Sequence, residues 1–151
     1  MSAEGTDFLY PFIDAEERGS DALLADLTRS ADAKWRESEE LAVVTLREAD
    51  SVIQAAAGAI ADSVGSGGKL FVFGNGGSAT DADALAHLFA SPPSGRSLPA
   101  RSLSADAAIV TALSNDVGFD LVFSRQLIAY GSAGDVALGL STSGNSEDLL
   151  V

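Results

Sequence analysis

Two short polar segments carry the side chains best suited to hold a small anionic ligand. The first, GNGGS at 74–78, combines Asn75 and Ser78 with three glycines, and the second, STSGNS at 141–146, places hydroxyls around a glycine. Glycines let a ligand approach the backbone closely, while the side chains donate neutral hydrogen bonds. The four hydroxyls of the second segment belong to Ser141, Thr142, Ser143 and Ser146. Such a set of neutral donors suits a phosphate monoester.

Each segment alone also fits an ordinary turn without a ligand. GNGGS lacks the G-x-G-x-x-G spacing of a dinucleotide-binding fingerprint and the lysine of a P-loop. STSGNS alone fits a group of helix-capping side chains. Because each segment follows a predicted strand, the two together favour a ligand site more than either does alone.

Apolar runs predict the strands that position these segments. KLFVFG at 69–74 predicts a parallel strand covered on both faces, followed by a helix that begins near Ser78. DVALGL at 135–140 predicts a second strong strand, and ARSLSA at 100–105 a weaker one. Ligands of open parallel sheets bind at the carboxyl ends of the strands, next to helix N-termini. The two polar segments are therefore expected at one edge of a sheet.

Helical periodicity accounts for most of the remaining sequence. The predicted helices cover about 20–46, as one helix or two, then 51–64, 106–116 and 119–131, with a last one beginning at Asn145. Helices between all strands indicate an α/β fold with a doubly wound, Rossmann-like parallel sheet flanked by helices. We expect a leader and amphipathic helical segment over 1–50 and the sheet domain over 51–151. Only about three strands are visible, so C-terminal strands are expected to be missing.

The amino-acid composition argues against nucleic acid and membranes as direct partners. Twenty-two acidic against nine basic residues give a formal net charge of −13, which repels nucleic-acid backbones and anionic lipid surfaces. The sequence has no cysteine and no apolar run long enough to span a membrane. These observations predict a cytoplasmic protein that contacts neither nucleic acid nor membrane directly.

The segments LFVFGNGGSATDA and ALSNDVGFDLVFSRQLIAYGSAGDVALGLSTSGNSEDLL resemble the sugar isomerase (SIS) domain, and within it the phosphoheptose (sedoheptulose 7-phosphate) isomerase group. The resemblance covers residues from about 51 to 151. It implies a phosphorylated sugar bound between subunits and a homo-oligomer, dimer or tetramer, assembled through N-terminal helices. The substrate-binding residues that it implies are Asn75, Gly76, Gly77, Ser78, Asn115, Asp116, Ser141, Thr142, Ser143 and Ser146. The serine turn would hold the phosphate, while Asn75 and the Asn115–Asp116 pair would meet sugar hydroxyls.

The resemblance fails at the catalytic positions. Aldose–ketose isomerisation needs a general base, and usually an acid, beside the substrate. The family's glutamate base falls on Leu88 and its zinc-holding histidine on Ala84, and neither residue can transfer a proton or bind metal. We expect both to pack on the buried side of their helix. The C-terminal histidine and glutamine of the family would lie beyond Val151, so no cofactor or metal site is predicted for this chain, although relatives hold zinc.

His87, the only histidine, is a weak catalytic candidate. Neighbours on a helix point about 100° apart, so His87 should not face the site that position 88 faces. It lies four residues after Asp83, and the two could form an ordinary ion pair or a relocated acid–base or metal pair.

Two hypotheses of function follow. The first is an isomerase acting on sedoheptulose 7-phosphate or a similar phosphosugar, with part of the chemistry supplied by residues outside this chain. The alternative is a non-catalytic SIS module that binds a phosphosugar regulator or a protein partner, like the SIS relative that engages the bacterial replication initiator.

Overall fold

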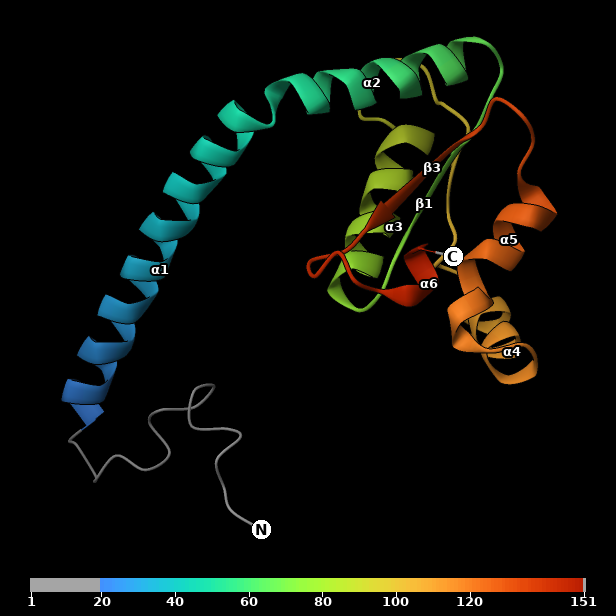
Figure 1. Ribbon diagram of the computed structural model, residues 1–151. Coiled ribbons are helices and arrows are strands. Elements are labelled where there is room, and N and C mark those ends of the chain that lie inside the picture. The colour runs from blue at the N-terminus through green and yellow to red at the C-terminus, as the bar shows by residue number, and fades with distance from the viewer. Residues whose placement is uncertain (1–19, 151) are drawn as a thin grey trace. The chain divides into compact units, whose positions relative to one another are not determined.

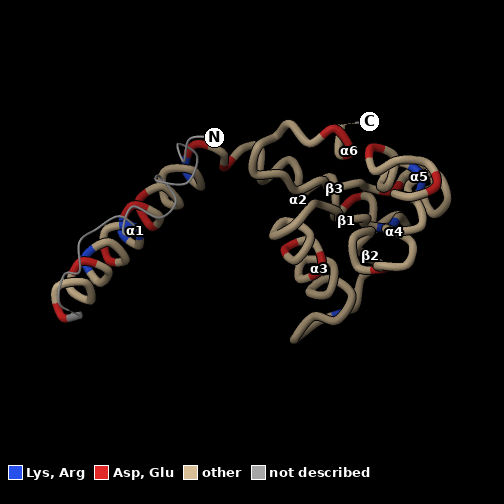
Figure 2. The backbone as a smooth tube through the Cα atoms, turned by 90° about the horizontal axis from the view of Figure 1, so that it is seen from below, with Lys and Arg blue, Asp and Glu red and all other residues tan. Residues whose placement is uncertain are grey.

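A computed structural model describes residues 20–150 of the chain (Figure 1). The chain divides into two compact units, residues 1–51 and residues 52–151. The first unit holds α1, Ser20–Glu48, which is a single helix of 29 residues where the sequence allowed one helix or two. Asp21 lies in its first turn and Arg47 in its last, and both charges complement the helix dipole. Figure 2 shows acidic and basic residues along the whole of α1.

The apolar side chains of α1 are exposed in this chain. Trp35 is 74% exposed and Leu41 65% exposed, so these apolar side chains of the helix lie largely open to solvent. The other large apolar side chains of α1 that are exposed are Leu23, Leu24, Leu27, Val43, Val44 and Leu46.

The second unit contains a parallel sheet of three strands in the order β2-β1-β3. The strands are β1, Leu70–Gly74; β2, Ala100–Ser102; and β3, Val136–Leu140. All five residues of the central strand β1 are buried, which confirms the prediction of a strand covered on both faces. Leu70 pairs with Ala100 on one side and with Val136 on the other.

Helices cover both faces of this sheet, as a doubly wound fold requires. On one face, α2 (Asp50–Gly65) and α3 (Gly77–Ala90) pack against Leu70 and Val72 through Ile60, Ala82 and Ala86. On the other face, α4 (Ala107–Asp116), α5 (Val122–Tyr130) and α6 (Glu147–Leu150) pack against the two phenylalanines of β1. The α/β class and the doubly wound arrangement are therefore confirmed. The predicted helix at 119–131 differs slightly, since it begins with a separate 3-10 turn, η1, at Phe119–Leu121.

Polar contacts fix the amino ends of β1 and β3. The backbone N–H of Lys69 donates to Asp135 Oδ1 at 2.8 Å, and Lys69 Nζ lies 3.6 Å from Asp135 Oδ2. The N–H of Ser132 donates to Asp135 Oδ2 at 2.8 Å. These contacts, above all the hydrogen bond from the backbone of Lys69, hold the pKa of Asp135 below its ordinary value.

Within residues 20–150, no helix is long and apolar enough to cross a membrane.

Candidate functional site

The two polar turns leave the sheet side by side. Gly74, the last residue of β1, pairs with Leu140, the last residue of β3. A Cβ atom at Gly74 would lie 2.7 Å from the carbonyl oxygen of Leu140 and 2.9 Å from Ser78 Cβ, distances that side chains do not tolerate. Glycine at this position therefore lets β1, β3 and the start of α3 approach closely, as expected for the carboxyl edge of a parallel sheet.

The first turn is held by the segment after β2. The hydroxyl of Ser104 donates to the carbonyl of Gly74 at 2.9 Å and lies 3.3 Å from the N–H of Gly74, which donates to it. Gly76 has a φ of +53°, a left-handed conformation that favours glycine, and α3 begins directly after it. Ser104 was not among the predicted site residues, because nothing in the local pattern links it to a turn 30 residues earlier.

Three hydroxyls converge in the second turn. Ser141 Oγ lies 3.4 Å from Ser143 Oγ and 3.2 Å from Ser146 Oγ. The N–H of Gly144 donates to Ser141 Oγ at 3.0 Å, and the N–H of Asn145 donates to Ser143 Oγ at 3.2 Å. Ser141 and Ser143 are exposed and Ser146 is half-buried, so the cluster faces solvent and is open to a ligand. Thr142 is exposed beside them.

A side-chain contact links the two turns. Asn75 Nδ2 lies 3.0 Å from Asp148 Oδ1 and 2.9 Å from Asp148 Oδ2, so the amide donates to the carboxylate. Asn75 belongs to the first turn, while Asp148 lies in α6, directly after the serine turn. Asp148 is only 5% exposed, so the Asn75 amide supplies a hydrogen-bond donor to a carboxylate that is largely shielded from water.

Asn115 and Asp116 lie elsewhere, at the end of α4. Both are exposed, and Asn115 Nδ2 donates to Asp116 Oδ1 at 3.0 Å. Among the residues that the structure describes, no hydrogen bond joins this pair to either turn. The 3-10 turn η1 that follows the pair contacts α6, so the chain returns to the neighbourhood of the serine turn three residues later. The structure thus brings together the two turns and leaves Asn115 and Asp116 on a neighbouring element.

The expectation that Ala84 and Leu88 are packing residues is wrong for this chain. Both are exposed, Leu88 by 53%, and the residues of α3 that face the sheet are Ala82 and Ala86, with Leu85 and Phe89 partly buried beside them. Positions 84 and 88 each follow a buried alanine by two residues, or about 200° around the helix, so they lie on the opposite side.

His87 is exposed in the same helix. In the part of the chain that the structure describes it has no ion pair with Asp83, whose carboxylate instead accepts a hydrogen bond from the hydroxyl of Ser102. Within residues 20–150, no group of three or more His, Cys, Asp or Glu side chains could hold a metal ion. The described residues therefore do not fit the zinc that the family resemblance brings with it.

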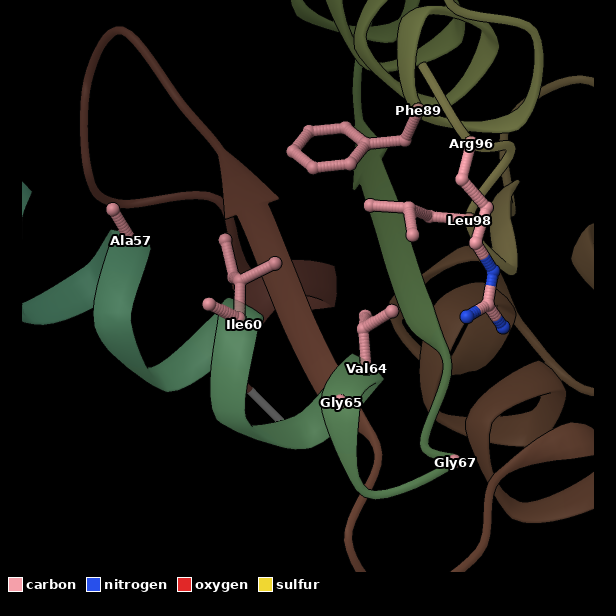
Figure 3. A pocket seen from close by; sticks show the side chains of 9 residues that line it. Ala57, Ile60, Val64, Gly65, Gly67, Phe89, Arg96 and Leu98 are labelled. Atoms are coloured by element: carbon pink, nitrogen blue, oxygen red, sulfur yellow. The ribbon is translucent and has the colours of Figure 1, made fainter.

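A pocket of about 580 Å³ lies away from these turns (Figure 3). Figure 3 shows Ile60 and Val64 of α2, Phe89 of α3 and Leu98 around one space, with the guanidinium of Arg96 at its side. No residue of the two polar turns lines it. The walls of this pocket are mostly apolar and offer few fixed hydrogen-bond donors. We therefore place the candidate site at the two polar turns, which have such donors, and not in this pocket.

Comparison with known proteins identifies the family that the sequence matches. The family model described as the SIS domain matches residues 35–150. A curated phosphoheptose isomerase from Chlorobaculum parvum is 47% identical over 117 residues, which are 75% of this chain and 56% of that protein. A phosphoheptose isomerase from Aquifex aeolicus is 42% identical over 118 residues, covering 77% of this chain and 62% of that protein. The chain thus spans less than two thirds of the length of these relatives.

A solved structure gives the same match at the level of the fold. The phosphoheptose isomerase from Neisseria gonorrhoeae superposes with a TM-score of 0.71 at 37% identity, covering 82% of this chain and 65% of that one. This similarity supports the doubly wound arrangement independently of the sequence motifs.

Proposed function

The chain belongs to the SIS domain family, within its phosphoheptose isomerase group, and on this basis we propose that its two polar turns bind a phosphorylated sugar. The substrate class that we propose is sedoheptulose 7-phosphate or a closely similar phosphosugar. The serine turn holds the phosphate in this proposal. Asn75, Gly76, Gly77 and Ser78 line the adjoining side, and Asn115 and Asp116 contact sugar hydroxyls.

The observation that carries this proposal is the convergence of three hydroxyls. Ser141 Oγ lies within 3.4 Å of both Ser143 Oγ and Ser146 Oγ, on a solvent-facing turn beside Gly74. Several hydroxyl donors grouped around Ser141 suit the peripheral oxygens of a phosphate, each of which accepts more than one hydrogen bond. The net charge of −13 opposes anions at long range, so binding depends on these short-range hydrogen bonds rather than on a basic patch.

Two candidate activities fit a phosphosugar site. The first is aldose–ketose isomerisation, the reaction type of the phosphoheptose isomerase group, with a proton-transfer residue supplied from outside this chain. The second is non-catalytic binding of a phosphosugar or protein partner. The exposed side chains of Ala84 and Leu88 favour the second candidate, since α3 presents no group at these positions that can move a proton.

The same proposal includes a cellular location and an oligomeric state. We propose a cytoplasmic protein, supported by the absence of cysteine, and a homo-oligomer assembled through the N-terminal helices, supported by the exposed apolar side chains of α1.

Isothermal titration calorimetry tests the binding proposal. We expect saturable binding of sedoheptulose 7-phosphate, no binding of unphosphorylated sedoheptulose at the same concentration, and competition by inorganic phosphate. Binding of the two sugars with equal affinity would exclude the serine turn as a phosphate site. Absence of any binding at millimolar ligand would contradict the proposal as a whole.

Hydrogen–deuterium exchange at C1 of sedoheptulose 7-phosphate, or at C2 of the corresponding aldose, followed by NMR, separates the two activities. The isomerase candidate predicts exchange in the presence of the protein, whereas the binding candidate predicts none. The double substitution Ala84→His with Leu88→Glu then asks whether α3 alone lacks the required groups. Exchange that appears only in this variant would support the loss of the catalytic pair from a retained binding site.

A further inference from the structure

Asn75 of the first turn contacts Asp148, a residue of α6 directly after the serine turn that the proposed function leaves unused. Asp148 is 5% exposed, and both its carboxylate oxygens lie within 3.0 Å of Asn75 Nδ2. Ionised carboxylates are rarely buried to this degree unless a donor satisfies them. The partner that satisfies Asp148 is Asn75, which lies 73 residues earlier in the sequence, in the first turn.

We propose that Asp148 is a positioning residue for ligand binding, which ties the two turns together and fixes which end of the Asn75 amide is free to meet the sugar. The inference rests on the proposed function. A carboxylate only accepts hydrogen bonds, so Nδ2 of Asn75 must face it. The reversed amide would bring the oxygen of Asn75 against two carboxylate oxygens, with no hydrogen between them.

This orientation gives the first turn a defined chemistry. With Nδ2 engaged by Asp148, Oδ1 is the end of the Asn75 amide left for other partners, and it only accepts. A sugar hydroxyl can donate to Oδ1, whereas the oxygens of a dianionic phosphate monoester carry no hydrogen to donate. Asn75 therefore selects for the sugar, and the hydroxyls of the serine turn select for the phosphate.

Asp148→Asn tests the assignment with almost no change of shape. An asparagine at 148 has both a donor and an acceptor, so it can pair with either end of the Asn75 amide and no longer fixes its orientation. Glu147→Gln is the matched control, since Glu147 is the exposed neighbour in α6 and its substitution removes the same charge. Calorimetry of wild type and both variants would use two probes, sedoheptulose 7-phosphate and inorganic phosphate.

We expect Asp148→Asn to weaken binding of sedoheptulose 7-phosphate about tenfold. Binding of inorganic phosphate should stay the same or tighten, because a negative charge near the anion has been removed. Glu147→Gln should leave the affinity for the sugar phosphate within about twofold of wild type. Equal weakening for both probes would overturn the inference, because it would show only a general structural role. Unchanged or tighter binding of both would also overturn it.

A reciprocal exchange separates orientation from simple linkage. The double variant Asn75→Asp with Asp148→Asn restores an amide–carboxylate contact between the turns, but it presents a carboxylate where the amide stood. We expect the unfolding temperature of the double variant to lie closer to that of wild type than the unfolding temperature of Asp148→Asn does. Its binding of the sugar phosphate should stay weak. Recovery of sugar-phosphate affinity would overturn the assignment of the Asn75 amide. Failure of the wild-type protein to bind either probe would overturn the proposed function, and this inference with it, whereas the outcomes above overturn the inference alone.

Discussion

Gly74 and Leu140 are paired residues that end two neighbouring parallel strands, and the carbonyl oxygen of Leu140 occupies the space where a side chain at position 74 would begin. The two polar turns of the candidate site start directly after this pair. Close contact between the strand ends is thus the structural condition for bringing the turns together.

Gly74→Ala is expected to destabilise the domain by about 3 kcal/mol. Its Cβ would lie 2.7 Å from a backbone oxygen, which cannot move away without distorting β3. Urea unfolding followed by circular dichroism measures the change. Gly77→Ala is the matched control, since a Cβ there meets no atom within 4 Å. It should leave stability unchanged or raise it by up to about 1 kcal/mol through better helix propensity. A similar loss in both variants would contradict the steric explanation.

Ser143→Ala is expected to weaken phosphosugar binding about tenfold, because one hydrogen bond to a charged group is lost from the cluster. Stability should change little, since Ser143 is exposed. Calorimetry with sedoheptulose 7-phosphate measures the effect. Ser132→Ala replaces another exposed serine, whose side chain forms no hydrogen bond within residues 20–150, and should bind like wild type. Equal affinities in the two variants would place the phosphate elsewhere.

Asp135→Asn should flatten the dependence of stability on pH in the acidic range. The pKa of Asp135 is lower in the folded protein than its ordinary value, so at acidic pH the unfolded chain binds more protons. The stabilisation is present above about pH 4 and is lost as pH falls through the folded-state pKa. Urea unfolding between about pH 6 and about pH 3 measures the slope. Asp62→Asn, at an exposed position in α2, serves as control and should keep the slope of wild type.

The fluorescence of Trp35 can report self-association through α1. Trp35 is the only tryptophan and is 74% exposed in the single chain, so its fluorescence should shift to shorter wavelength as protein concentration rises and copies cover α1. Leu41→Glu places a charge among the exposed apolar side chains of α1 and should abolish the shift. Sedimentation velocity gives an independent measurement. A monomer with constant emission at all concentrations would contradict assembly through this helix.

The central strand of the sheet was predictable because it is strongly apolar. KLFVFG has no polar residue after Lys69, and the structure buries every residue of β1. The adjacency of GNGGS and STSGNS followed from the rule that parallel strands share a carboxyl edge, and the pairing of Gly74 with Leu140 confirms it. The roles of the individual side chains in these turns remain predictions.

Contacts between distant residues were not predictable from a single sequence. The bonds of Asn75 to Asp148 and of Gly74 to Ser104 join segments 73 and 30 residues apart, and no local pattern marks either pair. The burial of Ala84 and Leu88 was predicted wrongly for a different reason. An apolar side chain does not by itself identify the buried face, because α3 has apolar side chains on two faces and the sheet covers only the one with Ala82 and Ala86.

The pairing of β1 with β3 also bears on how the domain folds. Leu70 and Val136 are paired although they lie 66 positions apart in the sequence, so this ladder closes a long loop and is expected to form after the local helices. The paired turns exist only once that closure is complete. A ligand held between the two turns would bind the native state and not the states that precede it in folding. It would therefore lower the unfolding rate and leave the folding rate unchanged.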